Sequence, residues 1–348
     1  MKKWSSLFAL AALLVSCAIL LLGAALPKVP SMPAAVSSNA VASLKGGLQI
    51  FSLMGVGPRK TWDDITNQVY VLNLASQKWN LGRPVPGVAG RLGSSAIGVK
   101  GQIFLFGGYV VDAQGNENTV SDVNAYVPEG RRWYSGTDIP VAVDSAVLGI
   151  NHERYIYLVG GRSKSGPVNN VQVYDIEKNS WSQATPFPGT PVFGHAGGLA
   201  DDAIVFVNGA MKNPASGPPY IASEDCWVGK IDKKDPNKIQ WSKLPTHPGP
   251  ARFGIAGGAE GKKVYFSGGS IAPHNYKGIG YDGKPADVST MTFEFDVHGN
   301  RWETVEEETA DARMDNRGIL STPPGPIVLG GMVQNQTVTS RAMLLPKK

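Results

Sequence analysis

The stretch YIYLVGGRSKSGPVNNVQVYDIEKNSW, residues 155–181, contains the pattern that decides the fold. An apolar run ends at Gly160-Gly161, a polar loop follows, a second run alternates apolar and polar residues, and a turn leads to Trp181. Short alternating runs bounded by Gly, Asn and Asp are typical of half-buried β-strands. The doublet permits a backbone path that a Cβ atom would obstruct. The stretch therefore predicts three successive strands of one small antiparallel sheet.

The same pattern recurs along the chain. Glycine doublets begin at Gly107, Gly160, Gly268 and Gly330, and Met54-Gly55 and Asn208-Gly209 are degenerate copies. Most copies are followed by a tryptophan, and these lie at Trp79, Trp133, Trp181, Trp241 and Trp302. A spacing of about 50 to 60 residues suits a four-stranded propeller blade. Windows that begin 16 residues before each doublet align without gaps, and each opens with a small-residue strand such as GSSAIG or HAGGLA.

The doublet, the aromatic residue in the third strand and the spaced tryptophan resemble the kelch repeat. This resemblance covers nearly all of the chain after Leu26 and implies an all-β fold, a six-bladed kelch-type β-propeller over residues 27–348. The last copy ends without a tryptophan segment. Residues 26–33, LPKVPSMP, are similar to the fourth-strand tails of other copies, so we expect this segment to join the last blade and close the ring.

The N-terminal segment, residues 1–26, is a predicted signal peptide or membrane anchor. Lys2 and Lys3 precede an apolar run from Leu7 to Leu26, which is typical of an export signal and is also long enough to span a bilayer. Three alternatives remain: cleavage near Gly23-Ala24-Ala25, retention as an anchor through residues 4–26, and lipidation at Cys17. Each predicts an exported protein, periplasmic or extracellular, with membrane association if the leader is retained.

The composition excludes some partners. A net charge of +5 is scattered rather than concentrated, so nucleic acid is not expected to bind. We find no HExxH, GxSxG, P-loop or CxxC motif, and the five histidines fall at unlike positions. We therefore predict no metal site and no cofactor.

A ligand site is expected at one mouth of the central channel. The long loops between second and third strands emerge on that face, and loops held by a rigid scaffold are where binding residues concentrate. Unlike polar side chains break the repeat symmetry there. The predicted ligand-binding residues are Arg91, Arg252, Arg317, Asn316, Tyr109, Tyr220 and Tyr276, and the catalytic candidates are His195, Asp144, Glu224 and Asp225. Trp62, His274 and Tyr281 are further loop residues able to contact a sugar.

Arginine suits carboxylates because its planar fork pairs with both oxygens, which favours a small anionic ligand. Arginine at the first window position also fits the kelch consensus. A structural role for Arg91 and Arg252, bonded to backbone or to a neighbouring blade, therefore stays open.

The layout also resembles the bacterial N-acetylneuraminate epimerase family, through its export signal, its kelch blades, Asn208-Gly209 in blade four and a long Asn/Tyr/Gly-rich loop in blade five. That resemblance implies acid–base equilibration of a sugar anomer. However, Ala210 stands where the family has a glutamate, and the next residues, MKNPASG, contain no arginine where the family has one a few positions on. Two hypotheses result: a propeller that binds an anionic or carbohydrate ligand or an extracytoplasmic protein, and a sugar epimerase or mutarotase.

Overall fold

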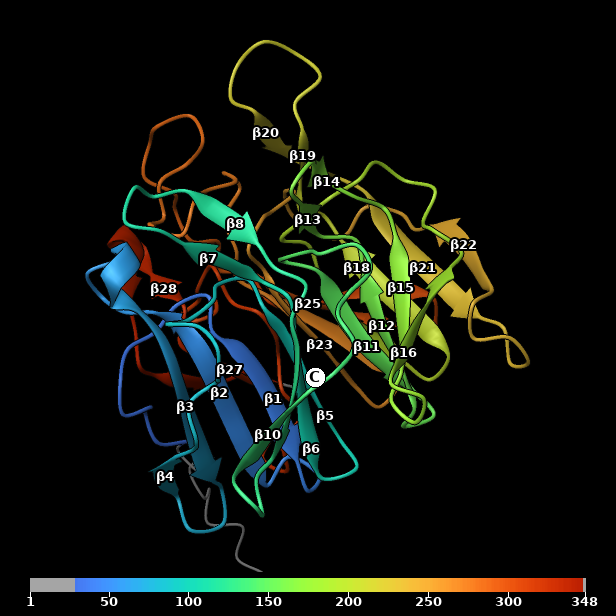
Figure 1. Ribbon diagram of the computed structural model, residues 1–348. Helices are drawn as coiled ribbons and strands as arrows, with labels where there is room; N and C mark the ends of the chain where they lie inside the picture. Colours follow the sequence, from blue (N-terminus) through green and yellow to red (C-terminus); the bar gives the residue numbers. More distant parts are fainter. Residues whose placement is uncertain (1–28, 347–348) are drawn as a thin grey trace, which may run out of the picture.

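The computed structural model describes residues 29–346, and these residues form a β-propeller of small antiparallel sheets around a central channel (Figure 1). The predicted leader lies outside the described residues. Five sheets have four strands, and each pairs its strands in chain order. The all-β propeller prediction is confirmed.

The strands of the five blades are as follows. Blade one has β1 (Ala40–Leu44), β2 (Gln49–Val56), β3 (Ile65–Asn73) and β4 (Lys78–Leu81). Blade two has β5 (Ser95–Val99), β6 (Gln102–Phe106), β9 (Val123–Val127) and β10 (Arg132–Ser135). Blade three has β11 (Val147–Asn151), β12 (Tyr155–Val159), β15 (Val171–Asp175) and β16 (Ser180–Ala184). Blade four has β17 (Ala196–Ala200), β18 (Ala203–Val207), β21 (Cys226–Ile231) and β22 (Ile239–Lys243). Blade five has β23 (Ala256–Glu260), β24 (Lys263–Ser267), β25 (Thr292–Asp296) and β26 (Arg301–Glu306).

Small hairpins extend the blades on one face of the ring, which is the upper face in Figure 1. They pair β7 (Tyr109–Val111) with β8 (Glu117–Thr119), β13 (Arg162–Ser163) with β14 (Gly166–Pro167), β19 (Ala210–Lys212) with β20 (Tyr220–Ala222), and β28 (Met332–Val333) with β29 (Thr337–Val338). Two 3-10 turns, η1 (Trp62–Asp64) and η2 (Gln334–Gln336), also lie in the described chain. We call this side the loop face.

The prediction of six blades is wrong in number, because the structure has five. The residues expected to form the sixth make only a two-stranded sheet, β27 (Ile327–Leu329) with β30 (Ala342–Leu344). The chain before β27 adds one bridge to this sheet, between Leu320 and Ile327, and another between Met314 and Met332 of β28. These shorter pieces nevertheless lie between blades five and one, because Ile319 donates to the carbonyl of Gly257 and Gly318 lies against Val41.

The predicted closing strand is not formed by the described part of residues 26–33. Instead Met32 donates one backbone hydrogen bond to Ser340, and Val29 and Met32 pack in an apolar cluster with Ile327 and Leu329. Each repeat tryptophan donates its indole N–H to a carbonyl outside its own blade's strands. The acceptors of Trp79, Trp133, Trp181, Trp241 and Trp302 are Pro30, Arg83, Thr137, Thr185 and Pro245. At blade one, therefore, the N-terminal segment supplies the acceptor that the preceding blade's tail supplies elsewhere.

The glycine doublets connect neighbouring units. A Cβ at Gly268 would lie 1.9 Å from the carbonyl oxygen of Arg313, so only glycine allows this approach. The amide of the second doublet glycine donates across the junction, as in Gly269 to Arg313 and Gly331 to Val36.

A ring of six equivalent residues surrounds the mouth of the channel on the loop face. Their φ angles lie between 55° and 65°, and they are Ser38, Gly93, Ser145, Gly194, Gly254 and Asp315. Backbone hydrogen bonds join neighbours, including Ser145 to Gly93, Gly194 to Ser145 and Gly254 to Gly194. Ser38 donates to the carbonyl of Asp315. The ring holds the mouth in one geometry, and the candidate site lies on it.

Candidate functional site

The site consists of two connected hollows. The channel encloses about 250 Å³ and is lined by the first strands of the five blades together with residues 316–321. Above it, on the loop face, lies a tight crevice of about 10 Å³. Ser145 and Arg317 line both hollows. A crevice of this size has room for about one water-sized group.

Arg162 occupies one side of the crevice. Its guanidinium pairs with Asp144 at 3.1 Å and with Glu117 at 2.7 Å, and it lies over the rings of Tyr109 and Phe193. Burial alone would lower the pKa of Arg162. The negative charges of Asp144 and Glu117 more than offset this effect, so the pKa lies above its ordinary value. Because the pair with Glu117 joins blade two to blade three, Arg162 links the β7–β8 and β13–β14 hairpins.

Arg317 and His274 occupy the other side. Arg317 donates to Asp315 at 2.8 Å and to the Ser38 hydroxyl at 3.3 Å. The Nδ1 atom of His274 lies 3.0 Å from the carbonyl oxygen of Asn275. Burial lowers the pKa of His274, so its ring is neutral near pH 7. A carbonyl only accepts, so Nδ1 carries the hydrogen and Nε2 has a free lone pair.

Several buried polar atoms of these hollows have no hydrogen-bond partner. They are Asp144 Oδ1, His274 Nε2 and Arg317 Nε in the crevice, and both ring nitrogens of His195 in the channel wall. Buried polar groups are nearly always paired, so these atoms need an explanation. Other unpartnered atoms of the described residues lie away from the mouth, on Asn39, Arg91, Trp227, Arg252, Glu294 and Arg313. Burial lowers the pKa of His195 to about 3, which keeps it neutral at physiological pH.

The structure corrects the role predicted for Arg91 and Arg252. Both are almost fully buried inside blades and line neither hollow. Arg252 donates to the Gly268 carbonyl, the Ser289 hydroxyl and the Met291 carbonyl, and stacks on Phe293. Arg91 donates to Asn124 at 2.7 Å. The structural role that had stayed open for these two arginines is the correct one.

Arg313 is a third buried arginine of this kind, and it donates to the carbonyls of Gly330 and Arg341. Burial lowers the pKa of each of the three guanidiniums, Arg91, Arg252 and Arg313, to about 10. They remain charged at neutral pH, and each makes polar contacts inside the protein but keeps one or two buried nitrogens without a hydrogen-bond partner.

Other predicted residues do lie at the mouth. Tyr109, Asp144, Tyr276 and Arg317 line the crevice, as do His274 and Tyr281. Asn316 and His195 line the channel. Tyr220 packs edge-on against Phe193 and Tyr281, with ring centroids 5.0 Å from each, and so supports the crevice wall from outside.

Two catalytic candidates are displaced from the mouth. Glu224 and Asp225 lie between β20 and β21 and line neither hollow, and Asp225 pairs with Lys243 at 2.6 Å. Trp62 is half-exposed on η1 and also stands apart from both hollows. Ala210 is fully buried and bridges Phe193, so no acid occupies that position.

The sequence interpretation missed Arg162, Glu117, Asp315, Phe193 and Phe253, which also line the crevice. A signal for Arg162 exists, since it directly follows a glycine doublet, as Tyr109 does. Residues after the doublets pair with the strand that leads into the mouth ring, as in the bridges Leu92 to Tyr109 and Asp144 to Arg162. Among residues 29–346, no group of three or more His, Cys, Asp or Glu side chains is arranged to hold a metal ion. Within the same range, no helix is long and apolar enough to cross a membrane.

Comparison with known proteins agrees with this architecture. Residues 50–269 match the family described as the KLHDC2/KLHL20/DRC7 Kelch-repeats domain. The chain belongs to the kelch-repeat family, as the doublets and tryptophans had indicated.

Similar curated proteins include kelch-like protein 15 of Gallus gallus, 26% identical over 114 residues, which are 33% of this chain and 23% of that protein. Kelch-like protein 38 of Homo sapiens is 29% identical over 133 residues, 38% of this chain and 22% of that protein. Beta-scruin of Limulus polyphemus is 26% identical over 173 residues, 49% of this chain and 18% of that protein. The chain therefore matches only about a fifth of the length of these relatives.

A solved structure described as that of YjhT superposes with a TM-score of 0.74 at 17% identity, covering 92% of this chain and 97% of that chain. Identity this low shows a shared fold and nothing about the site.

Proposed function

We propose that this protein is a binding propeller whose loop face holds a ligand or a partner protein over the mouth of the channel. The observation that carries the proposal is the convergence, on one rigid ring, of buried polar atoms without partners from blade three, from the loop of blade five and from residues 315–317. Sites for ligands characteristically combine apolar walls with a few convergent polar groups. The aromatic rings of Tyr109, Phe193, Phe253 and Tyr281 supply such walls here.

The projecting hairpins suit a partner protein as well as a small ligand. The β13–β14 and β19–β20 hairpins lie side by side, with Lys212 against Gly166 (Figure 1). Ile271 is exposed beyond β24, in the long loop of blade five. Kelch propellers commonly bind protein partners, which fits this use of the loop face.

Photo-crosslinking from both faces tests the proposal. A photoreactive amino acid is introduced at Lys212, on β19 of the loop face, or at Lys178, in the exposed turn before β16 on the opposite face. We expect specific crosslinks to a glycan or a protein from position 212 only. Crosslinks from position 178 alone, or no crosslink from either position, would contradict it.

We further propose that the protein acts outside the cytoplasm, as the positive and apolar leader of residues 1–26 indicates. Mass spectrometry of the mature N-terminus, combined with cell fractionation, distinguishes cleavage, anchoring and lipidation. A full-length chain in the cytoplasmic fraction would overturn this proposal.

A sugar isomerase is the second candidate. It is favoured by the acid–base groups at the mouth, where Asp144 and neutral His274 each keep a free acceptor atom. It is disfavoured by Ala210 at the position of the expected acid. Anomer exchange of N-acetylneuraminic acid, followed by NMR with and without the protein, tests it. If the protein does not change the rate of anomer exchange, the isomerase is rejected and the binding function is retained. If the protein accelerates exchange and Asp144→Asn abolishes the acceleration, the isomerase is established.

A further inference from the structure

The charges at the mouth differ from those expected of an anion site. The charged side chains that line the crevice are Glu117, Asp144 and Asp315 against Arg162 and Arg317. Both arginines are already paired, at 2.7 Å with Glu117 and at 2.8 Å with Asp315. With Arg91 and Arg252 buried in the blades, no unpaired guanidinium among the lining residues faces a ligand carboxylate. An anionic group would meet an excess of negative charge.

The unpartnered hydrogen-bonding atoms of the crevice indicate which kind of ligand group would fit there. Asp144 Oδ1 and His274 Nε2 accept hydrogen bonds, and Arg317 Nε donates one. A cation would serve the two acceptors but would leave Arg317 Nε unpaired. A hydroxyl group both donates and accepts, so it serves atoms of either kind.

The size of the crevice and its aromatic walls also favour a hydroxyl group of a sugar. A crevice of about 10 Å³ has room for about one water-sized group, such as a hydroxyl. Aromatic rings border it, and the larger channel begins at Ser145 and Arg317. Aromatic faces offer apolar contact to the C–H groups of a sugar ring, while hydroxyls engage the polar atoms.

We propose that the mouth recognises an uncharged polyhydroxylated ligand, a neutral sugar, one of whose hydroxyls enters the crevice between Asp144, His274 and Arg317. The inference rests on the proposed binding function and gives it a ligand class. The same charges disfavour the carboxylate-bearing sugar suggested by the sequence resemblance.

Matched sugar pairs test the inference on the purified full-length protein. Dissociation constants are measured by calorimetry for glucose and glucuronate, galactose and galacturonate, and mannose and mannuronate, whose members differ in one carboxylate. We expect at least one neutral member to bind ten-fold or more tightly than its uronate. Tighter binding of the uronates throughout would overturn the inference while leaving a binding propeller.

Variants locate the site. Asp144→Asn should weaken binding of the neutral sugar at least ten-fold, and His274→Met should do the same without removing an ion pair, which covers the case in which the first variant does not fold. Asp225→Asn, a carboxylate loss outside both hollows, is the matched control and should stay within two-fold. Equal binding by His274→Met and the wild type would place the sugar elsewhere and overturn the inference.

The sugar and crosslinking experiments together separate the inference from the proposed function. If none of the six sugars binds but crosslinks still form from position 212, only the sugar class is refuted. Failure of both experiments would refute the proposed function too.

Discussion

Arginines lie in two regions of this propeller, and the comparison separates support of the fold from recognition. Inside the blades, Arg91, Arg252 and Arg313 are buried, and Arg252 and Arg313 donate to backbone carbonyls of their own repeat. At the mouth, Arg162 and Arg317 pair with carboxylates and line the crevice. The same side chain thus links backbone segments in one place and arranges a polar hollow in the other.

The largest effect is expected inside a blade. Arg252→Met should lower the free energy of unfolding by about 3 to 5 kcal/mol, because three acceptors lose their donor in a dry interior. Urea denaturation measures this. Arg301→Ala, at an exposed ion pair, is the control and should leave the urea midpoint nearly unchanged. A similar small loss for Arg252→Met would erase the distinction between the two regions.

Acid should destabilise the channel wall through His195. The pKa of His195 is about 3 in the folded protein, below the value in the unfolded chain. The contribution of this group to the free energy of unfolding is therefore complete above about pH 6.5 and falls as the pH drops. The loss is about 1.4 kcal/mol per pH unit, or about 2 kcal/mol at pH 5. His195→Asn should flatten the dependence of unfolding free energy on pH by this amount between pH 6.5 and pH 5. An unchanged slope would show that the ring is solvated or paired.

A smaller loss is expected at the mouth. Arg162→Gln removes two ion pairs from a side chain that is 15% exposed, and it should lower the free energy of unfolding by about 1 to 2 kcal/mol. The measurement is again urea denaturation. A loss as large as that of Arg252→Met would give Arg162 a structural role equal to that of the interior arginines.

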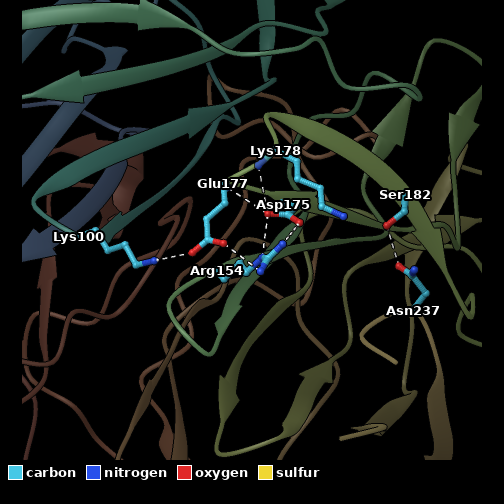
Figure 2. A network of polar contacts seen from close by, with 7 residues as sticks. All are labelled: Lys100, Arg154, Asp175, Glu177, Lys178, Ser182 and Asn237. Atoms are coloured by element: carbon cyan, nitrogen blue, oxygen red, sulfur yellow. Dashed lines mark hydrogen bonds and ion pairs between the residues drawn. The ribbon is translucent and has the colours of Figure 1, made fainter. Parts of the chain in front are cut away.

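The smallest effect is expected on the face opposite the hairpins. Lys100 pairs with Glu177 at 3.2 Å, and Glu177 also meets Arg154, which pairs with Asp175 (Figure 2). Lys100 and Glu177 are about half exposed, so Lys100→Ala should change the free energy of unfolding by less than about 0.5 kcal/mol. Thermal denaturation at low and high salt checks this. A loss above about 1 kcal/mol would show that this network acts as a unit.

The fold could be predicted because its determinants are local. Glycine doublets and tryptophans are required by close backbone approach and by inter-blade hydrogen bonds, and both recur in the sequence. The number of blades could not be predicted in this way, because a glycine doublet indicates only that a second strand ends there and not that four strands form. After Gly330-Gly331 the strands are too short to form a full sheet.

The site was only partly predictable, because counting backward from a doublet crosses a turn of variable length. The turn between β11 and β12 is one residue longer than that between β5 and β6. Arg91 is therefore equivalent to Val143 rather than to Asp144, as the bridges Leu92 to Tyr109 and Asp144 to Arg162 establish. This one-residue shift in the alignment led to the wrong prediction that Arg91 and Arg252 lie at the mouth. It also meant that Arg313 was not recognised as their equivalent.

The most direct test compares two arginines four positions apart, Arg313 inside the last segment and Arg317 at the mouth. Stability and affinity for the tightest-binding neutral sugar are measured for Arg313→Met and Arg317→Met. Arg313→Met should lose about 3 kcal/mol of unfolding free energy and keep its affinity within two-fold. Arg317→Met should lose at least ten-fold in affinity, together with about 3 kcal/mol of unfolding free energy, because it leaves Asp315 buried without its ion-pair partner. Wild-type affinity in Arg317→Met would contradict the account.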